Sequence, residues 1–232
     1  MKLLVANRGE VAIRVLRAAA ELGIPSVAVY SKDDESALHT GKADEAVGLD
    51  GVGPTAYLDG EAILKVASET GCDAVHPGYG FLAEDAGFAS ACAAAGVTFI
   101  GPGADTLALF GDKTRARAVA AETGVAVLAG ANEPVSLEEA KAFFADISPG
   151  VMLIKPVHGA GGRGIRFVRA AGEIDDAFAS SQAEAQAAFG SEAVYVEELL
   201  KDARHIEVQI VADAAGGVSH LGVCDCSIQR HF

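Results

Sequence analysis

The sequence has little of what marks a secreted or membrane protein. Its 232 residues include four cysteines without the close spacing of a disulfide framework, so we expect reduced thiols and a cytoplasmic protein. No run of about 18 apolar residues occurs, so no membrane span is predicted. The N-terminus becomes charged too soon for a signal peptide.

Basic side chains are also scarce. There are 18 Lys and Arg residues against 32 Asp and Glu residues, which gives a net charge of −14. A surface this acidic repels phosphate backbones, so we expect no nucleic-acid partner, although one small anionic ligand can still bind in a local basic pocket. The hydrophobic fraction is 50%, which supplies a buried core and excludes disorder as the main state.

The first half of the chain alternates short apolar strands with helices. This order predicts parallel strands with helical crossovers, and therefore a doubly wound α/β domain over residues 1–111. The predicted strands are residues 2–6, 26–30, 73–76 and 97–100, and the predicted helices are 10–22, 61–70 and 84–95. In the first helix we expect the buried face to consist of Val11, Val15, Ala18 and Leu22.

The second half, residues 112–232, has a different order of elements. A strand, a glycine-rich loop and a strand precede a helix and three further strands, which is typical of an α+β domain. The predicted helices are residues 112–122, 136–146 and 173–188, and the predicted strands are 151–155, 165–168, 194–198, 205–212 and 218–226.

The glycine-rich segment between two of these strands is the first candidate site. Residues 159–164 contain the spacing G-x-G-x-x-G, but a strand-like segment follows where a dinucleotide-binding fold needs a helix. The motif G-x-x-x-x-G-K-[ST] is absent, which excludes a P-loop. A glycine loop in a hairpin can still place N–H groups against phosphate oxygens; the alternative is a mobile surface hairpin.

Two lysines strengthen the phosphate interpretation. Lys155 ends an apolar strand directly before the loop, where its charge is costly unless an anion meets it. Lys113 stands at a predicted helix start, where a bound anion would offset the helix dipole; the alternative is an ordinary surface lysine.

The last strands carry cysteines and an alternating apolar pattern. We expect Ile206, Val208 and Ile210 to face the core, since their neighbours along the strand are polar. Cys224 and Cys226 share a face with Ile228, so we interpret them as small core residues. The alternative is zinc binding with His220 and His231, but the spacing does not fit a zinc finger or ribbon, and we expect no metal ligands in this chain.

Two further segments have both a structural and a functional interpretation. Residues 197–200 (EELL) are either a strand end at the solvent or a connector whose backbone pairs with an adenine edge. His76 lies at the carboxyl end of a predicted strand, where open α/β sheets bind ligands, but the residues themselves favour a Pro-Gly turn between strand and helix. The first strand-to-helix turn has one glycine, so we expect no dinucleotide in this domain.

Six motifs in order resemble those of the biotin carboxylases, including the biotin carboxylase parts of acetyl-, propionyl- and pyruvate carboxylases. The resemblance covers nearly the whole chain, and it implies a preATP-grasp domain over residues 1–111 followed by the first, incomplete part of an ATP-grasp domain over residues 112–232. The motifs are residues 5–12 (VANRGEVA), 76–84 (HPGYGFLAE), 99–102 (FIGP), 111–113 (GDK), 155–164 (KPVHGAGGRG) and 204–209 (RHIEVQ).

The resemblance also implies roles for individual residues. Lys113 and Lys155 would contact ATP phosphates, and Gly161 and Gly162 would belong to a lid loop. The adenine hinge would be Glu197, Glu198, Leu199 and Leu200, and the ribose and nucleotide pocket would include His205 and Gln229.

The implied reaction is that of a cytoplasmic ligase. ATP and bicarbonate give carboxyphosphate, with Mg²⁺ on the phosphates, and the carboxyl group passes to biotin on a carrier protein or domain. The implied partners are that carrier, a carboxyltransferase and, in the complete family member, a second copy in a homodimer; acetyl-CoA carboxylase and fatty acid biosynthesis are one such setting.

The sequence also departs from the family. The family pattern has one more Arg than residues 229–232 (QRHF), Ala160 interrupts the glycine run, and Glu198 replaces a residue that is often basic. The family's Mg²⁺-binding glutamates, bicarbonate-binding residues and general base have no counterpart before Phe232, so no catalytic residue is assigned and we expect these 232 residues to be inactive alone. The alternatives are a non-catalytic nucleotide-binding or assembly module and another ATP-grasp ligase.

Overall fold

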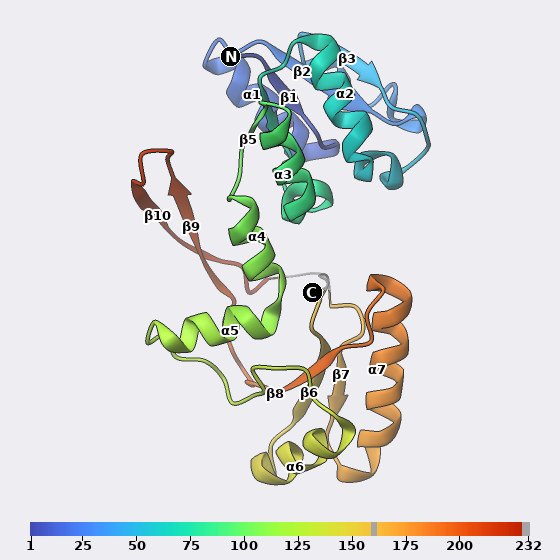
Figure 1. Ribbon diagram of the computed structural model, residues 1–232, viewed down its shortest axis with the longest axis vertical. Coiled ribbons are helices and arrows are strands. Elements are labelled where there is room, and N and C mark those ends of the chain that lie inside the picture. Colours follow the sequence, from blue (N-terminus) through green and yellow to red (C-terminus); the bar gives the residue numbers. More distant parts are fainter. Residues whose placement is uncertain (159–161, 229–232) are drawn as a thin grey trace. The chain divides into compact units, whose positions relative to one another are not determined.

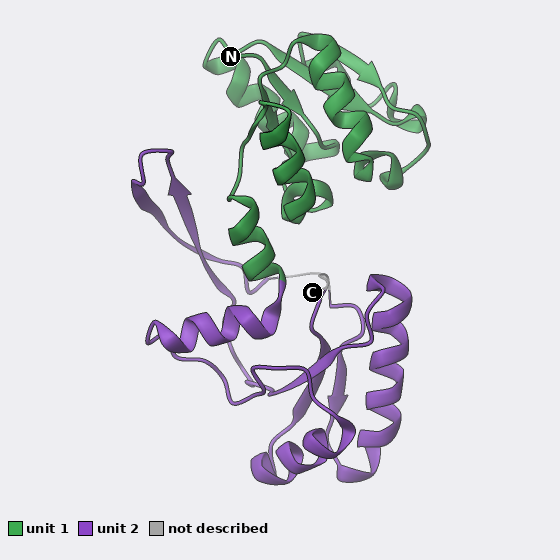
Figure 2. Ribbon diagram, viewed as in Figure 1, with its two compact units in different colours: residues 1–111 green, residues 112–232 purple. Residues whose placement is uncertain are grey.

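The computed structural model describes residues 1–158 and 162–228 and separates into two compact units, Met1–Gly111 and Asp112–Phe232 (Figures 1 and 2). The first unit contains a five-stranded sheet with the order β3-β2-β1-β4-β5, in which every pair is parallel. This confirms the predicted doubly wound α/β class. Its strands are β1 (Leu3–Val5), β2 (Ser26–Tyr30), β3 (Glu45–Gly48), β4 (Ala74–His76) and β5 (Thr98–Phe99).

Helices cover both faces of this sheet, as a parallel sheet requires. Helix α1 (Gly9–Glu21) packs on one face, while α2 (Gly60–Thr70) and α3 (Ala86–Ala94) contribute to the core on the other, and α4 (Ala104–Gly111) ends the unit. The strand order reverses between β1 and β4, so the carboxyl ends of these two strands form the switch point at which ligands bind in such folds.

The predicted buried face of α1 is wrong by one residue, which corresponds to a rotation of about 100°. Ala12, Leu16 and Ala19 are buried against the sheet, and of the predicted residues only Val15 packs beside them, partly buried. Ala18 is exposed, and Leu22 is 74% exposed because it lies past the helix end as the C-cap.

The sequence analysis missed one strand of this unit and one helix boundary. Strand β3 reads Glu-Ala-Val-Gly, is largely exposed and lies at the sheet edge, so it lacks the apolar run by which a buried strand is found. The expected helix over residues 84–95 is divided at Asp85. A short 3₁₀ helix over Phe81–Glu84 precedes it, and the Asp85 carboxylate then caps α3 by accepting a hydrogen bond from the Phe88 N–H at 2.8 Å.

The second unit contains a three-stranded antiparallel sheet, with the order β7-β6-β8, and a separate two-stranded hairpin. Helices α6 and α7 pack their apolar side chains on the sheet, around Met152, Ile154 and Val196. The elements are α5 (Lys113–Glu122), α6 (Leu137–Ile147), β6 (Met152–Pro156), β7 (Arg166–Val168), α7 (Ile174–Phe189), β8 (Val194–Glu198), β9 (Ile206–Ala212) and β10 (Val218–Asp225).

The hairpin of β9 and β10 corrects the expected core. Ile206, Val208 and Ile210 are 43%, 50% and 53% exposed, and Ile228 is fully exposed. Within the described residues β9 and β10 pair only with each other, and every residue of both strands is exposed, so neither face of the hairpin is covered.

The two cysteines of this hairpin are therefore not core residues. Cys224 is exposed and Cys226 half-buried, with the two sulfur atoms 3.6 Å apart. The Cys224 contact, followed by partial desolvation and nearby negative charge, raises the pKa of the Cys226 thiol to about 11. Across residues 1–158 and 162–228, no three His, Cys, Asp or Glu side chains are grouped closely enough to hold a metal ion. No helix in that part of the chain is both long and apolar enough to cross a bilayer.

A matched pair of isoleucines tests this distribution of the core. Ile154 has 0% exposure and Ile210 has 53%. We expect Ile154→Ala to lower the free energy of unfolding by about 2–5 kcal/mol, because it leaves a buried cavity, and Ile210→Ala to lower it by less than about 0.5 kcal/mol. Urea unfolding followed by circular dichroism measures both free energies. Equal losses of stability in the two variants would contradict the conclusion that no other element covers β9.

Candidate functional site

The pairing of β6 with β8 brings Lys155 to Glu197. Lys155 pairs with Tyr195 and Leu153 pairs with Glu197, so Lys155 and Glu197 are diagonal neighbours on one face of the sheet. The Lys155 Nζ donates a hydrogen bond to the Glu197 Oε1, although 42 residues separate the two in the sequence. Ile154 and Val196 face the opposite way, into the core with α6 and α7.

A second cation reaches the same carboxylate from α5. The Arg117 Nη1 lies 3.4 Å from the Glu197 Oε2, and the Arg117 Nη2 donates to the Leu128 carbonyl at 2.6 Å. The Glu197 side chain is only 9% exposed. The Tyr195 hydroxyl also lies 3.4 Å from Oε2, and burial, with the nearby Glu197 charge, raises the pKa of that phenol.

This cluster has a surplus of positive charge. One buried carboxylate faces one ammonium and one guanidinium group. A surplus cation beside a low-dielectric sheet favours a bound anion such as a phosphate.

The start of α5 lies next to the end of β6. The Lys113 N–H donates to the Val157 carbonyl at 3.4 Å, two residues beyond Lys155. Asp112 caps the helix by accepting from the Thr114 and Arg115 N–H groups at 2.9 and 3.1 Å. Partial burial tends to raise the pKa of Asp112, but these hydrogen bonds and that of the Thr114 hydroxyl outweigh it and lower the pKa.

The glycine-rich segment connects two antiparallel strands, β6 and β7, as expected. Gly162 and Gly164 have φ angles of 74° and 75°, which favour glycine. At Gly164 a Cβ atom would also lie 2.6 Å from the Pro156 Cγ. Gly161 lies outside the described residues.

The hinge residues comprise the last two residues of β8 and the two that follow it. The Glu198 N–H donates to the Ala129 carbonyl at 2.9 Å, and the Leu199 N–H donates to the Val151 carbonyl at 2.8 Å. Both amides are therefore engaged within the protein. Leu200, the last residue of the hinge, is 58% exposed.

His205 lies at the base of the hairpin, directly before β9. Its N–H donates to the Ser227 Oγ at 2.9 Å, its carbonyl accepts from the Cys226 N–H at 2.7 Å, and its Nε2 lies 3.2 Å from the Glu207 Oε1. In the part of the chain that the structure describes, no hydrogen bond or ion pair joins His205 to Lys155 or Glu197. Gln229 lies outside the described residues.

In the first unit, His76 ends β4 at the switch point, as predicted. The side chain of Asn7, 2% exposed, fills this edge and donates to the carbonyls of Pro77 at 2.6 Å and Tyr79 at 2.9 Å. The His76 Nδ1 accepts from the Gly78 N–H at 3.0 Å. These contacts favour a structural turn over a ligand site.

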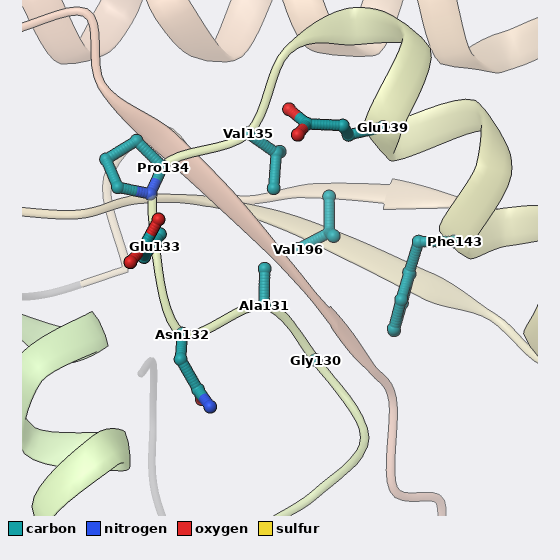
Figure 3. Close-up of a pocket in the computed structure, with 9 residues that line it drawn as sticks. All are labelled: Gly130, Ala131, Asn132, Glu133, Pro134, Val135, Glu139, Phe143 and Val196. Atoms are coloured by element: carbon teal, nitrogen blue, oxygen red, sulfur yellow. The ribbon is translucent and has the colours of Figure 1, made fainter.

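A pocket of about 430 Å³ in the second unit is a competing candidate (Figure 3). Val196 lines it and faces away from the Lys155 side of the sheet, but Gly130, which lies against Glu197 and Arg117, lines it as well, so the pocket borders the charged cluster from the other side. The Glu139 carboxylate at its wall caps α6 by accepting from the Ser136 N–H and hydroxyl. The lining residues are Gly130, Ala131, Asn132, Glu133, Pro134, Val135, Glu139, Phe143 and Val196. Two carboxylates without a lysine or arginine do not suit a phosphate ligand.

Sequence reasoning missed Arg117 and Gly130. Gly130 lets its segment approach β8 closely, because a Cβ there would lie 2.8 Å from the Glu197 Cβ and 2.9 Å from the Arg117 Nη2. The available signal was Glu197 itself, since a carboxylate in an apolar strand needs a cation.

The two parts of the chain match two family models. Residues 1–107 match the biotin carboxylase N-terminal domain, and residues 112–232 match the ATP-binding domain of the carbamoyl-phosphate synthase L chain.

Similar proteins with these domains are longer than this chain. Pyruvate carboxylase of Staphylococcus aureus is 47% identical over 99% of this chain and 20% of its own length. Biotin carboxylase 1 of Bacillus subtilis is 47% identical over 100% of this chain and 52% of its own length.

A solved structure agrees with these relatives. The biotin carboxylase domain dimer of Hydrogenobacter thermophilus 2-oxoglutarate carboxylase, in complex with MgADP, ADP and bicarbonate, has a TM-score of 0.93 and 44% identity over 99% of this chain and 51% of that chain.

The half-buried imidazole of His76 at the switch point predicts a pH-dependent stability. Burial lowers the pKa of His76, so the unfolded chain, with its imidazole near about 6.5, takes up the proton first. The stabilisation from a neutral His76 is therefore complete above about pH 6.5 and is lost as the pH falls toward the lower folded pKa.

His76→Asn, which keeps an acceptor for the Gly78 N–H, is expected to flatten the fall in stability between about pH 7 and pH 5. Urea midpoints measured across that range test this. The exposed His220→Asn is the control and should keep the slope of the unaltered chain. An unchanged slope in His76→Asn would show that His76 does not titrate in this way.

Proposed function

The chain belongs to the biotin carboxylase family, and on that premise we propose that it binds ATP as the nucleotide-binding part of a biotin carboxylase. The observation that carries the proposal is the cluster in which Lys155 and Arg117 both face the buried Glu197 carboxylate. Because the chain spans about half of the Bacillus subtilis biotin carboxylase and a fifth of the pyruvate carboxylase reported above, the activity and partners of the whole protein are part of the proposal.

We assign the ATP phosphates to the end of β6 and the start of α5. Lys155 offers its ammonium group, and Lys113 adds a second one from the helix start that is hydrogen-bonded to Val157. Gly161 and Gly162 are proposed to close over the phosphates, where glycine lets backbone N–H groups approach oxygen atoms closely.

We assign the adenine to the hinge of Glu197, Glu198, Leu199 and Leu200. The exposed Leu200 would supply the N–H donor, since those of Glu198 and Leu199 are already engaged. His205 and Gln229 are proposed to line the ribose side of the pocket.

The proposed reaction joins bicarbonate to the γ-phosphoryl group of ATP, which gives carboxyphosphate and ADP. The carboxyl group then forms a bond to the ureido nitrogen of biotin, which loses its proton, and inorganic phosphate leaves. Biotin would be bound to a carrier protein or domain, a carboxyltransferase would use the carboxylated product, and the complete enzyme would be a cytoplasmic homodimer.

Mg²⁺ is expected to accompany the nucleotide, as it accompanies ADP in the 2-oxoglutarate carboxylase structure. The described residues do not fit a metal site, because they form no group of three or more ligating side chains. We therefore assign no step to residues of this chain through Mg²⁺.

The final acceptor of the carboxyl group is a separate part of the proposal. The pyruvate carboxylase match favours a keto acid over acetyl-CoA and fatty acid biosynthesis. The alternative of another ATP-grasp ligase has support in the ATP-binding model, which is named for carbamoyl-phosphate synthase, but the match of residues 1–107 favours a biotin carboxylase.

Removing the Lys155 ammonium group tests ATP binding. We expect Lys155→Gln to weaken ATP binding by about 100-fold or more, because a charge-assisted hydrogen bond to phosphate is lost. Isothermal titration calorimetry measures the affinity. Lys141→Gln, which removes an α6 lysine paired with Glu138 of α6 and Asp175 of α7, is the matched control and should leave the affinity unchanged. An unchanged affinity in Lys155→Gln would remove the phosphate role from Lys155.

A further inference from the structure

The Glu197 carboxylate has two cationic partners that are held by different numbers of contacts. Arg117 is fixed by hydrogen bonds to the Glu197 Oε2 and to the Leu128 carbonyl, and its side chain is 13% exposed. Lys155 holds the other oxygen, Oε1, with a single ammonium group at the end of a flexible stem, and it is 21% exposed. Lys155 is therefore the partner that can leave.

Arg117 is also held by close backbone packing. Gly130 pairs with Glu197 in an isolated bridge, and a Cβ at Gly130 would lie within 2.9 Å of the Arg117 Nη2. The guanidinium group thus occupies a space that the segment around residue 130 and β8 define together.

The charge balance decides what happens when Lys155 moves. The Glu197 carboxylate is buried, and a buried carboxylate without a cationic partner strongly destabilises the folded protein. With Lys155 as its only partner, Glu197 would compete with a ligand phosphate for the same ammonium group. With Arg117 present, the carboxylate stays neutralised after Lys155 departs.

We propose that Arg117 is a positioning residue that holds and neutralises Glu197, so that Lys155 can pass from this carboxylate to a nucleotide phosphate. The inference rests on the proposed function, since it assumes that ATP is the ligand. It also gives α5 a second role besides carrying Lys113. Arg117 of this helix neutralises Glu197, so that Lys155 is free to bind a phosphate.

The test is a double-mutant cycle in ATP binding, measured by calorimetry on the full chain. Arg117→Ala is expected to weaken ATP binding by about tenfold, because Glu197 then retains Lys155. Glu197→Gln removes the competing charge, so adding Arg117→Ala to it should change the affinity by less than about threefold. Arg117→Lys keeps the positive charge beside Glu197, although not both guanidinium contacts, and should therefore bind ATP more tightly than Arg117→Ala.

The cycle separates this role from a purely structural one. If Arg117 only supports the fold, Arg117→Ala weakens binding equally with Glu197 and with Gln at that position, and the inference is overturned. The comparison of Glu197→Gln with the double variant remains informative if Arg117→Ala alone fails to fold, because the double variant contains no unpaired carboxylate. Arg115→Ala, an exposed arginine on the same helix, is the matched control and should bind ATP normally.

Failure of the inference differs from failure of the proposed function. If the unaltered chain binds ATP and Arg117→Ala binds it equally well, the positioning role is wrong and the nucleotide site stands. If the unaltered chain binds neither ATP nor ADP, both are overturned.

Discussion

The pairing register between β6 and β8 is the constraint on which the candidate site depends. It places Lys155 opposite Tyr195 and diagonal to Glu197, while Ile154 and Val196 face the core. A slip of one residue would exchange these faces and bury the lysine among apolar side chains. The packing of α6 and α7 on Met152, Ile154 and Val196 therefore fixes the charged cluster as well as the fold of the second unit.

Local sequence patterns predicted the elements whose signals are local. Strands β2 and β8 have the predicted bounds, and the glycine-rich segment joins an antiparallel pair as expected. The sequence also indicated that Lys155 at the end of an apolar strand must meet an anion. It did not reveal that the first anion is Glu197, nor that Arg117 shares it, because 42 and 80 residues separate Glu197 from these partners.

The errors have the same physical origin. Alternation along β9 correctly indicated two unlike faces, but it does not show whether another element covers the apolar one, and in the described structure none does. The Cys224 and Cys226 interpretation failed for that reason. In α1, the choice between the stripes through Val11 and Ala12 depends on how the helix lies on the sheet. Which face of a strand or helix is buried depends on packing between segments that are distant in the sequence. The sequence of a single segment carries little information about that packing.

The central claim is that Lys155 serves Glu197 in the ligand-free chain and a phosphate in the nucleotide complex. A crystal structure of the chain with a non-hydrolysable ATP analogue tests it most directly. The account predicts that the Lys155 Nζ lies within about 3 Å of a phosphate oxygen, while Arg117 retains Glu197. An analogue bound elsewhere, with Lys155 still on Glu197, would contradict it.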